Sequence, residues 1–203
     1  TERLMNAVQK ELRLDRQPRH IECFDNSNLQ GAHPVASCVV FRDGKPSRKE
    51  YRHFNIKTVT GADDYASMRE VVFRRYTRLM AEGAEMPDLI IADGGKGQMG
   101  VIHEVLERLG LDIPIAGLAK DDRHRTAELL CGFPPVLVGI RPTSPLFHFL
   151  AHIQEEVHRF AVSFHRQKRS KAFIHSELEQ IEGVGDKTVQ TLLRHFRTVE
   201  KVH

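Results

Sequence analysis

The sequence predicts an α/β protein in which a mixed five-stranded sheet is flanked by helices and is followed by a small all-α element. Three observations support this fold class. Three segments with strand character come first, and helical and strand patterns alternate after them. The short apolar run at residues 89–92 ends at a carboxylate, Asp93, and enters a helix through a glycine-rich turn. A second glycine-rich turn lies between two short helical segments near residue 184.

Length and composition place the chain among soluble globular proteins. The 203 residues suffice for one main domain and a smaller piece, and 40% of them are hydrophobic and 28% charged. We find no apolar run of membrane-spanning length and no signal peptide. The three cysteines form no C-x-x-C pair and are typical of buried thiols in a reducing compartment: Cys23, Cys38 and Cys131.

The first 17 residues are predicted to form a polar helix that ends at Pro18. Its apolar stripe is thin and consists of Leu4, Val8 and Leu12. We therefore expect residues 1–19 to be a helical linker outside the core.

Three strands are expected next, because apolar and β-branched residues dominate or alternate in three segments. A D-G turn at Asp43-Gly44 separates the second from the third. The three segments predict an antiparallel meander and comprise residues 20–25, 35–41 and 50–56.

A helix is predicted to begin near Asp64 and to end before Gly83, since apolar residues recur at helical spacing between them. Its outer face carries four arginines, which we interpret as a solvated face, with phosphate contact as the alternative: Arg69, Arg74, Arg75 and Arg78.

The remaining elements are predicted from the spacing of apolar residues and from the glycines and prolines that begin or end them. A helix at 98–109 is closed by Gly110, a strand spans 114–120, and a proline-interrupted hairpin spans 127–140. Pro145 begins a long helix that is expected to reach about residue 168. We expect His158 to lie directly beside the buried stripe of this helix. The stripe consists of Leu146, Leu150, Ile153, Val157, Phe160 and Phe164.

The turn after Asp93 admits several interpretations. Residues 95–100 match G-x-G-x-x-G, which is typical of a dinucleotide site, but a carboxylate before the turn would face the pyrophosphate. Gly97 follows Gly95-Lys96 where a P-loop needs Ser or Thr. A third interpretation makes Asp93 a metal ligand, with Lys96 and the N–H groups of the turn meeting a phosphate. The simplest alternative is a strand–turn–helix corner capped by Asp93.

The order of the elements is that of a ribonuclease H-like fold, in which the ends of the first and fourth predicted strands lie side by side. This arrangement would bring Asp25 and Asp93 together, and a late helix crossing the sheet could add His158. Two carboxylates and an imidazole suit Mg²⁺ or Mn²⁺. The E-x-x-H pairs at Glu50-His53 and Glu155-His158 do not predict a di-iron bundle, because the first lies on a predicted strand.

Residues 178–189 contain I-x-G-V-G-x-K between two short helical segments and resemble a helix-hairpin-helix element. Its glycines would let backbone N–H groups approach a phosphate without reading bases. A simple glycine turn is the structural alternative. The DNA-contacting residues of this element would be Gly183, Gly185 and Lys187.

Several sequence blocks resemble the C-terminal half of the UvrC family, the incision subunits of bacterial nucleotide excision repair. The similarity extends from about residue 19 to 195. The blocks are at residues 21–25, 35–41, 63–66, 93–98, 118–120, 156–161, 165–166 and 181–185.

The resemblance implies an RNase H-like endonuclease that cuts DNA on the 5′ side of a lesion. The family's catalytic Asp, Asp and His fall on Asp25, Asp93 and His158, and a further carboxylate important for the cut falls on Asp64. It also implies a bacterial cytoplasmic protein with no membrane association. Its partners would be damaged double-stranded DNA and the UvrB–DNA complex. The UvrB–DNA complex would be contacted through regions of the family that are absent from this chain. The family carries paired helix-hairpin-helix elements, and this chain stops after the first.

We expect domains at 20–170, the nuclease, and at 171–203, the partial helix-hairpin-helix domain. Basic residues would hold the DNA backbone: Lys96, Lys120, Arg159, Arg166, Lys168 and Arg169. The alternatives are a catalytically silent DNA-binding module of the repair complex and, with less support, a dinucleotide-dependent enzyme.

Overall fold

The computed structural model of the protein describes residues 1–27, 35–58, 63–120 and 126–179. Two compact units are present, Thr1–Ala161 and Val162–His203, and the sheet belongs to the first. The elements are α1 (Glu2–Glu11), β1 (His20–Ser27), β2 (Val35–Arg42), β3 (Lys45–Pro46), the 3-10 helix η1 (Arg48–Glu50), β4 (Arg52–Asn55), α2 (Asp64–Ala81), β5 (Leu89–Ala92), α3 (Lys96–Leu109), β6 (Ile115–Lys120), β7 (Thr126–Cys131), β8 (Val136–Val138) and α4 (Pro145–Glu179).

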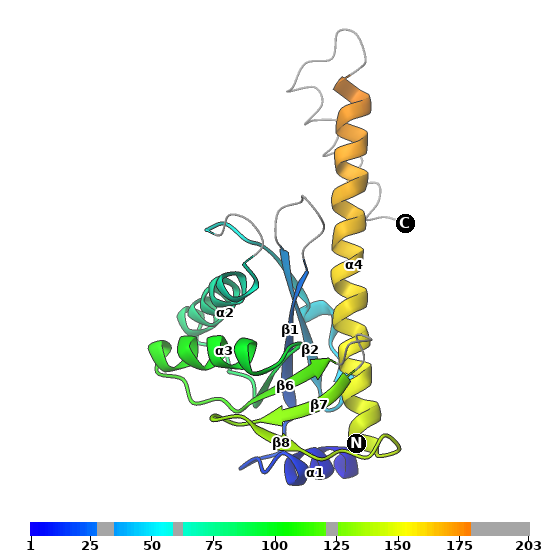
Figure 1. The fold of residues 1–203 in the computed structure, drawn as a ribbon. Coiled ribbons are helices and arrows are strands. Elements are labelled where there is room, and N and C mark those ends of the chain that lie inside the picture. Colours follow the sequence, from blue (N-terminus) through cyan, green and yellow to red (C-terminus); the bar gives the residue numbers. More distant parts are fainter. Residues whose placement is uncertain (28–34, 59–62, 121–125, 180–203) are drawn as a thin grey trace. The chain divides into compact units, whose positions relative to one another are not determined.

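The strands form one mixed sheet in the order β3-β2-β1-β5-β6-β7-β8, with β4 paired to β2 (Figure 1). Strands β1, β2 and β4 form the predicted antiparallel meander, whereas β1-β5 and β5-β6 are parallel. The sequence predicts that the first and fourth of its five expected strands lie side by side. These two strands are β1 and β5, which pair in parallel, so the prediction is confirmed.

The sheet is larger than the five strands expected. Strands β7 and β8 continue it beyond β6, and β3 adds a short pair to β2. The hairpin was expected from the sequence, but its attachment to β6 was not. This pairing satisfies the backbone N–H and C=O groups that would otherwise be exposed along the edge of β6.

Alternation along the central strands divides the core into two layers. On β1, Ile21 and Cys23 face one layer and Phe24 the other; on β5, Ile91 and Ile90 divide in the same way. Helices α2 and α3 cover one face of the sheet (Figure 1). The other face is covered by α1 and by the first part of α4, whose buried residues are Leu146, Phe149, Leu150, Ile153 and Val157.

The expectation that residues 1–19 lie outside the core is wrong. Met5, Val8 and Leu12 of the N-terminal segment are buried in the same layer as α4. The apolar stripe is thin, yet it is sufficient because the helix lies flat on a surface already formed by other elements. Burial of three apolar side chains stabilises the fold at about 25 cal/mol per Å² of apolar area.

The arginine-rich face of α2 is not uniformly solvated. Arg78 is exposed and pairs with Glu82, but the Arg75 side chain is only 10% exposed and pairs with Glu22 of β1. The helical spacing placed Arg75 on the outer face, whereas its long side chain reaches back to the sheet. The expectation of a solvated face is therefore wrong for Arg75.

Several element boundaries differ slightly from expectation, and β1 continues two residues past Asp25, to Ser27. Helix α3 begins at Lys96, two residues early, because Gly95 serves as its N-cap. Residues 48–50 form η1, so the third strand shortens to β4. Helix α4 extends to Glu179, past residue 168, and Ser144 caps its start, since Ser144 Oγ accepts a hydrogen bond of 3.1 Å from Phe147 N–H.

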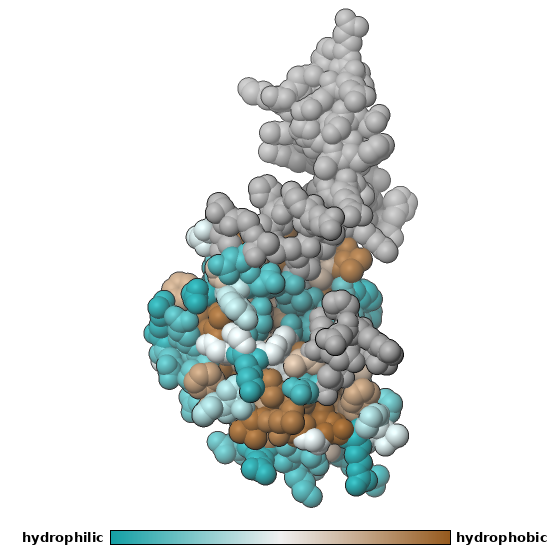
Figure 2. Space-filling model, in the orientation of Figure 1, coloured by the Kyte–Doolittle hydropathy of each residue, from teal (hydrophilic) through white to brown (hydrophobic). Residues whose placement is uncertain are grey.

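Apolar side chains are exposed on the β7–β8 hairpin, where Figure 2 shows a brown patch; they are Phe133, Val136 and Leu137. Within the described residues, no helix combines the length and apolar character needed to cross a membrane. None of the three cysteines forms a disulfide.

Candidate metal centre

The two candidate aspartates reach the same face of the sheet because strands alternate with a period of two. Cys23 and Ile91 are register partners on the parallel strands β1 and β5, and both face the α4 layer. Asp25 and Asp93 each come two residues later and therefore point to that layer too. The backbone N–H of Asp93 also donates a hydrogen bond of 3.0 Å to the carbonyl of Phe24, which holds the two strand ends together.

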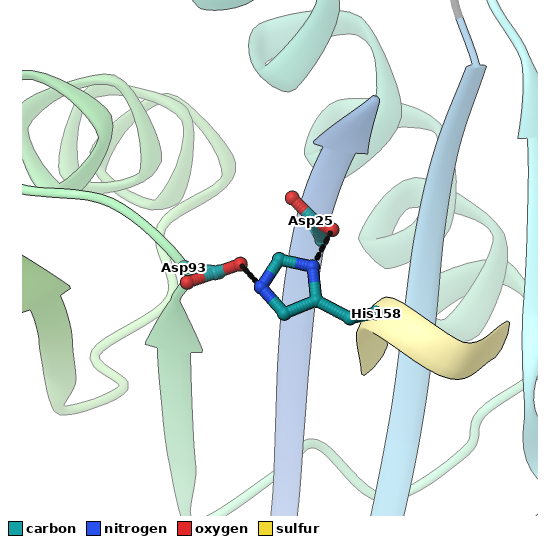
Figure 3. Close-up of side chains that lie close together, drawn as sticks. All are labelled: Asp25, Asp93 and His158. Carbon is teal, nitrogen blue, oxygen red and sulfur yellow. Dashed lines mark ion pairs between the residues drawn. The ribbon is translucent and has the colours of Figure 1, made fainter. Parts of the chain in front are cut away.

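Helix α4 supplies an imidazole between these carboxylates. His158 Nδ1 lies 3.2 Å from Asp25 Oδ2, and His158 Nε2 lies 3.1 Å from Asp93 Oδ2 (Figure 3). The Asp93 side chain is fully buried, that of Asp25 is 8% exposed, and that of His158 is 44% exposed. Each of the three residues offers one ligand atom, and these three atoms lie within 4.8 Å of one another.

This donor set fits a divalent cation. A carboxylate only accepts hydrogen bonds when ionised, and a neutral imidazole has one N–H donor. Each nitrogen of His158 faces one carboxylate. The cluster therefore favours a positive charge, carried either by the imidazole or by a bound cation. Carboxylate oxygens select hard cations such as Mg²⁺, and an imidazole ligand also suits Mn²⁺.

The turn of α4 that carries His158 is fixed to the sheet by a polar network. Tyr51 donates a hydrogen bond of 2.7 Å to buried Glu156, and Arg159 contacts the same carboxylate at 2.9 Å and 3.0 Å. Hydrogen bonding from the Arg159 guanidinium lowers the pKa of Glu156 to about 2, with Tyr51 acting in the same direction. His53 stacks on Phe160 at 3.6 Å between ring centroids and bonds to its carbonyl. His158 is therefore held from both sides along its helix.

The glycine-rich turn after Asp93 packs tightly against the sheet. A Cβ atom on Gly117 of β6 would lie 2.9 Å from the carbonyl oxygen of Gly94, so only glycine permits this approach. On the solvent side, an open cavity of about 760 Å³ is lined by Asp63, Asp64, Tyr65 and residues 95–98. Exposed Lys96 therefore lies at the edge of this open cavity.

Asp64 does not belong to the three-residue cluster among the described residues. It is the first residue of α2 and is exposed, and its backbone carbonyl accepts a hydrogen bond of 2.8 Å from Asn26 Nδ2 at the end of β1. The neighbouring Asp63 caps the helix, since its Oδ1 accepts from Ala66 N–H at 3.0 Å. Asp64 thus links the start of α2 to the strand that carries Asp25.

The basic residues predicted to bind DNA have different surroundings. Lys96 is exposed at the start of α3, whereas Arg159 is exposed but engaged by Glu156. Lys120 ends β6, and Arg166, Lys168 and Arg169 lie within α4; only their backbone is described. The hairpin residues Gly183, Gly185 and Lys187 lie outside the described residues.

Sequence reasoning missed two polar contributors to the site. Gln154 Nε2 donates a hydrogen bond of 3.0 Å to Asp93 Oδ1, and buried Glu156 anchors the His158 turn. Gln154 precedes His158 by four residues, a spacing that puts both on one helix face and was available in the sequence. Glu50, from the first E-x-x-H pair, accepts hydrogen bonds of 2.9 Å and 2.8 Å from Arg42 on the surface. Among the described residues it is not part of the candidate metal cluster.

Comparisons with known proteins place the chain in a family. Residues 9–162 match the family model described as the UvrC RNase H endonuclease domain. A UvrABC system protein C from Bacteroides fragilis is 60% identical over 200 residues, which cover 98% of this chain and 33% of that protein. Its counterpart from Streptococcus uberis is 59% identical over 192 residues, covering 94% and 32%.

The chain thus spans about a third of the length of these curated relatives. Among solved structures, Ciona intestinalis endonuclease V in complex with a 24mer DNA is similar with a TM-score of 0.39 and 14% identity, covering 60% of this chain and 59% of that one. Because the family model covers more than half of its residues, the chain belongs to the family of UvrC RNase H endonuclease domains.

Proposed function

We propose that this chain carries a divalent-metal-dependent DNA endonuclease site that makes the 5′-side incision beside a lesion in nucleotide excision repair. The observation that supports this most directly is the cluster of Asp25, Asp93 and His158 at the carboxyl ends of two parallel strands. Membership of the UvrC RNase H endonuclease domain family supports the reaction class.

The three residues have distinct roles in this proposal. Asp25 and Asp93 would hold Mg²⁺ or Mn²⁺ through their carboxylate oxygens. When bound, the ion would polarise the scissile phosphate and make a coordinated water more acidic. His158 supplies a third ligand atom or transfers a proton during hydrolysis, two roles that imidazole chemistry supports at neutral pH. Asp64 links the start of α2 to the strand of Asp25 and is a positioning residue.

DNA would be held without reading its bases. Exposed Lys96, which lines the open cavity at the starts of α2 and α3, contacts a phosphate. The remaining phosphate contacts are assigned to Lys120, Arg159, Arg166, Lys168, Arg169 and the hairpin residues Gly183, Gly185 and Lys187. The substrate is damaged double-stranded DNA presented as a UvrB–DNA complex in the bacterial cytoplasm, and lesion choice comes from those partners.

The test uses the full-length protein that contains this chain, with Asp93→Ala and His158→Ala variants. Each is assayed on end-labelled, lesion-bearing DNA together with the other repair subunits and Mg²⁺ or Mn²⁺. We expect the 5′ cut to fall by at least about 10²-fold in both variants, while DNA binding persists.

Two exposed residues serve as matched controls. Asp112→Ala and His148→Ala remove the same side-chain types from exposed positions outside the cluster and should leave the 5′ cut unchanged. If the cluster variants still cut at the normal rate, the catalytic assignment is wrong. The chain would then be a catalytically silent DNA-binding module.

A further inference from the structure

Gln154 contacts the candidate metal centre from one helical turn before His158. Its Nε2 lies 3.0 Å from Asp93 Oδ1, while His158 Nε2 lies 3.1 Å from Asp93 Oδ2. Two residues of the same helix face therefore contact the two oxygens of one buried carboxylate. The side chain of Asp93 has no exposed surface, and these two contacts help to orient its oxygens.

The direction of the hydrogen bond follows from the chemistry of the pair. An ionised carboxylate can only accept, so the amide of Gln154 must present its NH₂ group and not its oxygen. The donor is neutral, and hence it orients the carboxylate without cancelling the charge that a cation needs. An arginine or lysine at the same place would add a positive charge directly beside the site.

We propose that Gln154 is a positioning residue that fixes the orientation of the Asp93 carboxylate toward the proposed metal site. This inference rests on the proposed metal-dependent function and adds a residue that orients one of the proposed ligands. Outer hydrogen bonds to ligating carboxylates fix their orientation in this way, and their loss typically costs 10–100-fold in metal affinity or activity.

The anchoring of α4 supports this role. Glu156 and Phe160, on either side of His158, are tied to Tyr51 and His53. A helix fixed at these points cannot shift to follow Asp93, so the reach of Gln154 is constant. Without the hydrogen bond from Gln154, the Asp93 carboxylate would lose one of the contacts that fix its orientation.

The experiment measures Mn²⁺ binding to the full-length protein by calorimetry and by electron paramagnetic resonance, with no DNA present. The test variant is Gln154→Met, which keeps the length of the side chain but has no N–H donor. Gln154→Leu is the second test variant, for use if the methionine variant does not fold. Glu155→Gln is the matched control, because it is exposed on the adjacent position of the same helix. Asp93→Ala reports on the proposed function itself.

We expect Gln154→Met to weaken Mn²⁺ binding about tenfold or more and to change the resonance spectrum of the bound ion. Glu155→Gln should change neither, and circular dichroism should show the native helix content in both. A purely structural role for Gln154 would alter the melting temperature but not the spectrum of the bound ion. Wild-type affinity and spectrum in a folded Gln154 variant would overturn the inference alone. Wild-type binding by Asp93→Ala would instead overturn the metal site, and the inference with it.

Discussion

The guanidinium of Arg75 binds the carboxylate of Glu22 through two hydrogen bonds, with Nε 2.6 Å from Oε1 and Nη2 2.7 Å from Oε2. The two side chains are 10% and 1% exposed. Tyr76 donates a further hydrogen bond of 2.8 Å to the same carboxylate. This contact joins α2 to Glu22 of β1, three residues before Asp25. It therefore supports the strand that carries Asp25 from the opposite face of the sheet.

Arg75→Ala should lower the free energy of unfolding by about 3–5 kcal/mol, because it leaves a buried carboxylate without its charged partner. Urea denaturation followed by circular dichroism measures this. Arg78→Ala on the same helix is the control, since Arg78 is 78% exposed in its pair with Glu82. Its effect should stay below about 1 kcal/mol. Equal effects of the two substitutions would show that the buried contact contributes no more than a surface pair.

The same contact predicts a loss of stability in acid. Burial alone would raise the pKa of Glu22, but hydrogen bonds from Arg75 and His20 outweigh it and lower the pKa from 4.5 to about 2. A carboxylate with a lower pKa in the folded state stabilises the fold above its unfolded pKa. That contribution should therefore be lost progressively as the pH falls from about 4.5 to about 2. Thermal melts across this range, compared with those of Glu22→Gln, should show a shallower pH dependence in the variant; identical slopes would contradict the assignment.

Gly117→Ala should impair the site through the backbone. The added Cβ would meet Met99 Sδ at 2.6 Å and the carbonyl oxygen of Gly94 at 2.9 Å. We expect a destabilisation of about 1–3 kcal/mol and a loss of 5′ incision of up to about 10²-fold, since Gly94 follows Asp93 directly.

The control for Gly117 is Gly100→Ala in α3, where an added Cβ meets nothing within 4 Å. This helical position should gain about 0.5–1 kcal/mol from the higher helix propensity of alanine. Incision assays and urea denaturation on both variants check the pair. Normal incision by Gly117→Ala would mean that the turn after Asp93 tolerates displacement.

Met5→Ala tests whether the N-terminal helix belongs to the core. Met5 is fully buried, and its truncation should cost about 2–5 kcal/mol. Lys10→Ala, at an exposed position of the same helix, should stay within about 0.5 kcal/mol. If Met5→Ala has as small an effect as Lys10→Ala, α1 contributes nothing to stability.

Much of the sheet could be predicted because strand patterns and element order restrict the possible topologies. The strand character of residues 20–25 and the apolar run at 89–92 indicated β1 and β5, with Asp25 and Asp93 toward their carboxyl ends. The burial of α1 was not predictable, because a thin apolar stripe does not reveal which surface it will meet. The pairing of β7 with β6 depends on an unsatisfied sheet edge, which exists only once the sheet has formed.

Within the site, the three cluster residues were expected partly from element order and partly from family resemblance. Geometry then brings Asp25, Asp93 and His158 together. Arg75 and Gln154 escaped prediction for one reason: both have long side chains whose partners lie far away in the sequence. Helical spacing gives the direction of such a side chain at its root but not the group that its end will reach.

The three residues of the cluster come from β1, from the end of β5 and from α4, in that order along the chain. During synthesis, a polypeptide that has emerged only as far as α3 already has both carboxylates but still lacks the imidazole. Unfinished products shorter than 158 residues of this chain therefore cannot assemble the complete cluster. Because its last member lies on α4, the cluster of three is completed only after this helix has begun to emerge.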